Sequence, residues 1–78
     1  MPRFYFHLFD DLVSIDEEGK DLPSKDAARD EGIRSARDIA CAEVMRGRLN
    51  LAHRIEITDE AGTVMNTIWF REVLRVDE

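Results

Sequence analysis

Few side chains of this sequence could carry out catalysis or bind a metal ion. His7 and His53 are the two histidines, and Cys41 is the one cysteine. Zinc needs three or four such ligands, commonly at short spacings, but neither histidine has another His or Cys within six positions. Cys41 lies in the middle of a predicted helix, away from the N-terminus that would activate a thiol. We therefore expect a partly buried structural cysteine, with no catalytic residue, metal or cofactor.

An acidic stretch near the N-terminus is the second candidate for chemistry. Its members are Asp10, Asp11, Asp16, Glu17, Glu18 and Asp21. An EF-hand with Gly19 at loop position 6 would place Lys25 at position 12, where calcium needs a bidentate carboxylate. The motif therefore fails, and a solvated, charged turn region is the simpler interpretation. The sequence leaves open whether the segment Asp16–Asp21 binds a cation in another way.

Composition limits the classes of partner. The chain has 78 residues, is 44% hydrophobic, and carries a net charge of −6 with a pI of about 4.8, which predicts one domain that binds neither nucleic acid directly nor an anionic membrane. One cysteine cannot form an intramolecular disulfide, and no signal peptide or long apolar segment is apparent. A cytoplasmic location is the expectation.

The elements that must position these residues follow from hydrophobic periodicity. Alternating or aromatic-rich segments predict strands at 3–9, 12–15, 53–60 and 63–70. Small and apolar residues at helical spacing predict one helix over 25–46. Ser24 is suited to be its N-cap, and Gly47 follows its end. Val44 and Val64 are expected to point into the core.

This order of elements, ββαββ, predicts an α+β two-layer sandwich over residues 1–78. The sheet has four strands, is mainly antiparallel, and packs one face against the helix. The helix reverses the chain direction, so the third strand can lie antiparallel to the first. The predicted spatial order is second, first, third and fourth strand, which places the aromatic strand 3–9 inside the sheet.

The outer sheet face, opposite the helix, is the predicted interface. Its residues are Tyr5, His7, Phe9, Met65, Thr67 and Trp69. A two-layer fold has no further layer to cover them, and exposed apolar patches often mark interfaces. Alternatively, Leu74 and Val76 near the C-terminus fold over part of this face. A second candidate surface is the helix flank with Ala27, Cys41 and Met45.

Several segments together resemble one known family. They read PRFYFH at 2–7, DEEG at 16–19, LP at 22–23, AAR at 27–29 and RIEITDEAG at 54–62. The chain is similar to short, uncharacterised alphaproteobacterial proteins grouped as a domain of unknown function, so the resemblance implies a bacterial cytoplasmic origin and assigns no activity. Residues 19–39 are also similar to the HicB-type antitoxin domain, although only two strands precede the helix here and the DNA-binding extension of many such antitoxins is missing.

These observations leave the biological role unknown and favour a non-enzymatic module that binds a protein partner or self-associates as a homodimer. The alternative is an antitoxin-like regulatory protein that binds a basic protein partner. A small enzyme is the third hypothesis, and it requires His7, Cys41 and the acidic stretch to converge in a pocket.

Overall fold

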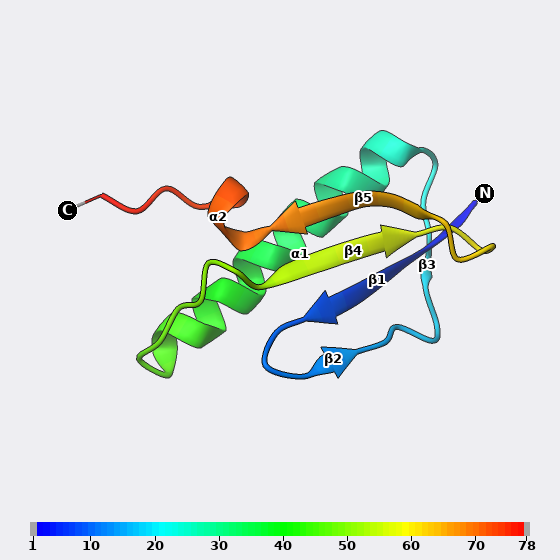
Figure 1. Cartoon of the computed structure of the whole chain (residues 1–78). Coiled ribbons are helices and arrows are strands. Elements are labelled where there is room, and N and C mark those ends of the chain that lie inside the picture. The colour runs from blue at the N-terminus through cyan, green and yellow to red at the C-terminus, as the bar shows by residue number, and fades with distance from the viewer. Residues whose placement is uncertain (1, 78) are drawn as a thin grey trace.

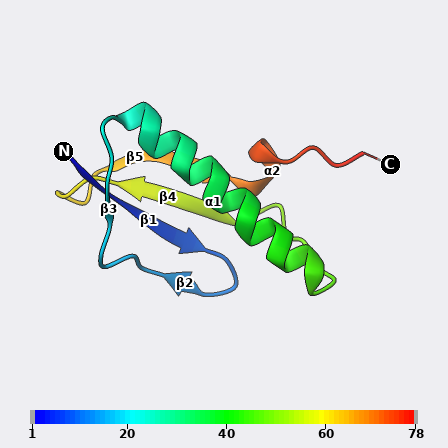
Figure 2. The ribbon, with the colours of Figure 1, turned by 180° about the vertical axis from the view of Figure 1, so that it is seen from behind.

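A sheet and one long helix form two layers in the computed structural model, which describes residues 2–77 (Figure 1). The strands are β1 (Arg3–Phe9), β2 (Val13–Ser14), β3 (Lys20–Asp21), β4 (Arg54–Thr58) and β5 (Val64–Trp69), and the helices are α1 (Lys25–Met45) and α2 (Phe70–Val73). Neighbouring strands are antiparallel, in the order β2-β1-β4-β5. The predicted α+β class and strand order are confirmed, with α1 covering one face of the sheet (Figure 2).

Strand β3 was not predicted. It pairs with the first residues of β1, Arg3 with Asp21 and Phe4 with Lys20, while β2 pairs with the last two. The chain between β2 and β3 leaves the ladder and then returns to it. Gly19 makes this return possible, because its φ of +69° is rarely adopted by other residues.

The long helix begins and ends close to the predicted residues. The Ser24 hydroxyl accepts a hydrogen bond from the Ala27 N–H (3.1 Å), and Gly47, with φ +89°, follows the last turn. Neither helix within residues 2–77 is long and apolar enough to cross a membrane.

The buried face of α1 consists of small residues and one acid: Ala28, Gly32, Ala36, Ala40 and Glu43. Four residues advance 400° around a helix, which is 40° more than a full turn, so repeated steps of four move the buried positions around the helix. A step of three residues moves them back toward the sheet. That step selects Glu43, and Val44 is 55% exposed. The prediction that Val44 is buried is therefore wrong.

Close approach of helix and sheet explains the small residues. A Cβ at Gly32 would lie 2.8 Å from Ile57 Cδ1 and 3.2 Å from Ile68 Cγ1, so a larger residue would require these buried side chains to shift. The sheet contributes Phe4, Ile55, Ile57 and Ile68 to this core, and Phe70 of α2 completes it.

Two predicted positions near the C-terminal strand differ in the structure. A β-bulge shifts the register of β4 and β5, so Val64 pairs with Thr58 instead of pointing into the core, and it is 52% exposed. The chain after α2 extends away from the sheet (Figure 1), and Val76 is exposed. Leu74 packs against the core. The C-terminal residues thus do not fold over the outer sheet face.

Candidate functional site

The six residues of the predicted interface lie on β1 and β5, and each is partly buried. They are Tyr5, His7 and Phe9 on β1, and Met65, Thr67 and Trp69 on β5. Strand β4 separates these two groups, because it pairs with β1 on one side and with β5 on the other. The outer face therefore has a polar central strip, made of Arg54, Glu56 and Thr58, between two aromatic or apolar strips.

An arginine joins the two strips at one end of the face. Arg54 pairs across the ladders with Phe9 and Trp69, and its guanidinium carbon lies 4.2 Å and 5.3 Å from their ring centroids. Arg71 approaches the same Trp69 ring at 4.6 Å, and Arg54 Nε is 3.2 Å from a Glu56 oxygen. Cation–π contacts hold planar groups in fixed orientations. This end of the face is thus an ordered arginine–aromatic cluster.

The other end of the outer face is partly covered by the loop between β2 and β3. Thr58 Oγ1 lies 3.0 Å from His7 Nε2, and the Asp16 N–H donates to His7 Nδ1 (3.1 Å). A backbone N–H can only donate, so Nδ1 is the acceptor and the proton of the neutral ring is on Nε2. Gly19 packs so closely that a Cβ there would be 2.8 Å from Tyr5 Cε2. Through its two hydrogen bonds, His7 of β1 is linked to Thr58 of β4 and to Asp16 of the loop between β2 and β3.

The carboxylate of Asp16 organises this loop. It accepts hydrogen bonds from the N–H groups of Phe6, Glu18 and Gly19, each at 3.1 Å. Burial raises the pKa of Asp16, but these three backbone hydrogen bonds favour the charged carboxylate, so that the pKa lies below its ordinary value. Asp16 is therefore a structural acid whose oxygens are already bound by the backbone.

The remaining acids of the predicted stretch do not converge with Asp16. Asp21 forms an ion pair with Arg3 at 3.0 Å. Across residues 2–77, no group of three or more His, Cys, Asp or Glu side chains is arranged to hold a metal ion.

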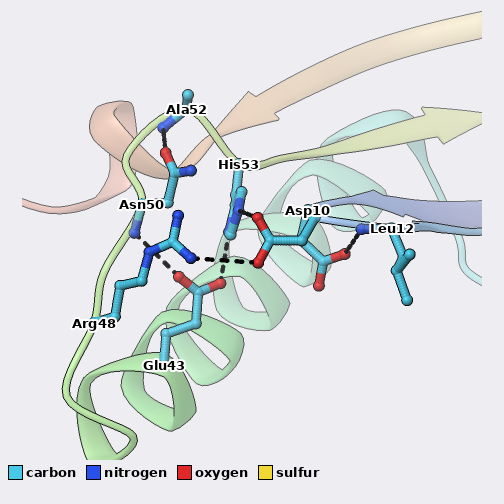
Figure 3. Close-up of polar contacts among 8 residues, drawn as sticks. Asp10, Leu12, Glu43, Arg48, Asn50, Ala52 and His53 are labelled. Atoms are coloured by element: carbon cyan, nitrogen blue, oxygen red, sulfur yellow. Dashed lines mark hydrogen bonds and ion pairs between the residues drawn. The ribbon is translucent and has the colours of Figure 1, made fainter.

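A second polar cluster, which the sequence did not reveal, joins the end of α1 to the turn after β1 (Figure 3). Glu43 and His53 are each only 7% exposed, and Glu43 Oε2 lies 2.7 Å from His53 Nδ1. Glu43 Oε1 accepts the Asn50 N–H at 3.2 Å. On the other side of the ring, Asp11 Oδ1 is 3.5 Å from Nε2, and Arg48 is 3.6 Å from the second Asp11 oxygen.

The chemistry available to this cluster is limited by its composition. A pocket of about 240 Å³ is lined by Asp10, Asp11, Glu43, Arg46, Arg48 and His53. A histidine held by a carboxylate is the general base of many nucleophilic enzymes, but that role needs a hydroxyl or thiol at Nε2. None lines this pocket, and His53 Nε2 is buried without a hydrogen-bond partner among the described residues. The arrangement suits a structural link.

The residues of the enzyme hypothesis are placed apart. His7 and Asp16 meet on the outer sheet face, whereas Cys41 lies on α1, in the other layer. Cys41 is exposed, so the expected partial burial is wrong. On the helix flank of the second predicted surface, Met45 is 83% exposed.

Comparisons with known proteins give a single result. No curated protein matches the chain, and no solved structure matches it. One family model, described as a domain of unknown function (DUF6894), matches residues 3–71, which include the whole sheet and α1. The chain therefore belongs to the family of the domain of unknown function DUF6894.

Proposed function

We propose that this protein is a small, non-enzymatic interaction module that associates with another protein chain through the outer face of its sheet. The observation that carries the proposal is the arginine–aromatic cluster of Phe9, Arg54, Trp69 and Arg71. Trp and Arg are enriched among the residues that dominate binding energy. Aromatic rings held in place by cations lose little freedom when a partner binds.

An interface of ordinary size would take a modest share of the molecular surface. Specific interfaces bury about 800 Å² on each side. The described surface measures 5382 Å², so such an interface would use roughly a seventh of it. In Figure 1 no helix or strand lies in front of β1, β4 and β5. The partner to be tested first is a second copy of the chain, which gives a homodimer.

The test is a comparison of wild type with Trp69→Asp by light scattering, over a range of protein concentrations. We expect a dimer whose dissociation constant rises at least about thirtyfold in the variant, because a Trp that dominates binding contributes about 2 kcal/mol or more. Val76→Asp is the matched control, since it adds the same charge at an exposed position after α2, where the chain extends away from the sheet. A wild-type monomer that also forms no Trp69-dependent complex with a purified host protein contradicts the proposal.

The alternative function is an antitoxin-like regulatory protein that binds a basic protein partner in the bacterial cytoplasm. The net charge of −6 and the local HicB likeness favour it. A small basic toxic protein encoded beside this gene, neutralised when the two are produced together, would support this role. A neighbouring gene product that is neither toxic nor bound would exclude it.

A further inference from the structure

One edge of the sheet is open to an additional strand. β5 is the last strand of the order β2-β1-β4-β5 and has six residues, whereas the opposite side ends in the two-residue β2. Edge strands present unpaired backbone groups with which another chain can pair. The β5 edge is therefore the longer of the two available templates.

Two hydrogen bonds show which backbone N–H and C=O groups of β5 point toward β4 and which point toward the open edge. The Phe70 N–H donates to His53 O (3.0 Å), toward β4, whereas the Trp69 N–H donates to the Glu72 carboxylate (3.3 Å). Backbone groups of successive strand residues point to opposite sides. The N–H and C=O of Thr67 therefore point away from β4, toward the open edge. The Glu72 carboxylate occupies the Trp69 N–H, whereas the backbone groups of Thr67 remain free to pair with an added strand.

A groove runs beside this edge on the helix side. The first half of α1 extends past β5 in both views (Figures 1 and 2). A hollow of about 240 Å³ lies there, with Arg29, Ile33 and Arg37 on its helix wall and Thr67 on its strand wall. Val73 closes one end, where its carbonyl accepts the Arg37 Nε–H at 3.0 Å.

The groove is basic although the whole chain is acidic. Arg29 and Arg37 line it together with one acid, Glu72, whose carboxylate already accepts the Trp69 N–H. Within residues 2–77, the Arg29 side chain has no hydrogen bond or ion pair. The Arg29 guanidinium therefore remains available for a carboxylate.

We propose that an extended acidic segment of another protein adds to β5 as a further strand. Its backbone pairs with Thr67, and its side chains alternate between the two faces of the enlarged sheet. Acidic side chains on the helix side meet Arg29 and Arg37, and apolar ones on the outer side lie beside Met65 and Trp69. This surface adjoins the outer face of the proposed function at Met65 and Trp69, but its main contacts are made by the backbone edge of β5 and by the helix.

A second copy of the chain is a poorer occupant of this edge. Antiparallel pairing of two β5 strands about a two-fold axis would bring the two Arg29–Arg37 walls to the same junction. Like charges placed opposite each other destabilise strand pairing. Charge complementarity thus favours an acidic segment over the protein itself.

The test is an NMR titration of the ¹⁵N-labelled protein with a capped peptide, Thr-Glu-Val-Glu-Val-Glu-Thr. We expect saturable shifts centred on the Thr67 amide and on Arg29 to Arg37. The matched peptide with Lys in place of each Glu should bind at least about tenfold more weakly. Absence of shifts up to about 1 mM peptide, equal binding of both peptides, or shifts away from β5 overturns the proposal.

Variants separate the groove from general charge effects. Arg29→Gln/Arg37→Gln should weaken binding of the acidic peptide at least about tenfold, since two ion pairs are lost. Arg34→Gln/Arg46→Gln removes two charges outside the groove, one from α1 and one from the residue that follows its end, and should change the affinity less than about threefold. Equal loss in both double variants contradicts the proposal. Outer-face association, measured by light scattering, should persist in Arg29→Gln/Arg37→Gln, so the two proposals fail independently.

Discussion

At the scale of single residues, the most enclosed polar contact is the one between Glu43 and His53. Both side chains are largely buried, and the carboxylate is hydrogen-bonded to His53 Nδ1 and to the Asn50 N–H together. A buried acid without such partners would be strongly destabilising. The pair therefore fixes where the chain leaves α1 and enters β4.

Replacing Glu43 with Gln tests this link. Gln keeps the shape but removes the charge and one acceptor, so we expect the free energy of unfolding to fall by about 1–3 kcal/mol. Urea denaturation measures the change. Asp38→Asn, at an exposed position of the same helix, should stay within about 0.5 kcal/mol of wild type. Equal effects of the two substitutions would show that Glu43 contributes nothing beyond its charge.

Asp16 gives stability a defined pH dependence. Its folded pKa lies below the ordinary value of 3.8, so the unfolded chain binds the proton more readily. The stabilisation is complete above about pH 4 and is lost as the pH falls through the folded pKa. Asp16→Asn should reduce stability near neutral pH by about 1–2 kcal/mol and flatten the fall toward about pH 3.

Denaturation of wild type and Asp16→Asn at both pH values measures this difference. Glu17→Gln is the control, because Glu17 is the exposed neighbour of Asp16 and its replacement should not change the loss of stability at low pH. If Asp16→Asn and wild type lose the same stability on acidification, the backbone hydrogen bonds do not favour the charged form of Asp16.

At the scale of elements, the packing of α1 on the sheet depends on the absence of a side chain at Gly32. Ala would add about 1 kcal/mol of helix propensity. Its Cβ would meet Ile57 and Ile68, which are buried and cannot move freely. We expect Gly32→Ala to lower stability by about 1–2 kcal/mol despite the better helix former.

Thermal unfolding followed by circular dichroism measures the Gly32→Ala effect. Asp38→Ala raises helix propensity at an exposed position and should be neutral or stabilising. If Gly32→Ala behaves in the same way, the helix and sheet can separate enough to accept a methyl group, and the close approach is not required.

Periodicity predicted the elements, because strands of period 2 and a helix with caps leave strong local signals. It missed β3, whose two residues Lys20 and Asp21 are exposed and carry no pattern. It also missed Glu43, because a charged residue is normally assigned to the solvent side of a helix. Only its partner His53, brought near by the turn after α1, makes that burial favourable.

At the scale of the whole molecule, the sequence predicted the two-layer α+β architecture but not the arginine–aromatic cluster on the outer sheet face. Strand order places Arg54 between Phe9 and Trp69, and this depends on contacts between residues far apart in the chain. Net charge was equally incomplete, since a total of −6 conceals the arginines beside β5. Sums over a sequence do not report where charges gather.

The unequal edges of the sheet limit how many strands from other chains can add to the molecule. On the β1 side, strand pairing is divided between two short segments, β2 and β3, whereas the β5 side offers one continuous strand. Once a chain has added to β5, the other edge offers only the two-residue β2 for further pairing. Strand addition to this protein therefore yields a finite pair rather than a fibre, even at high concentration.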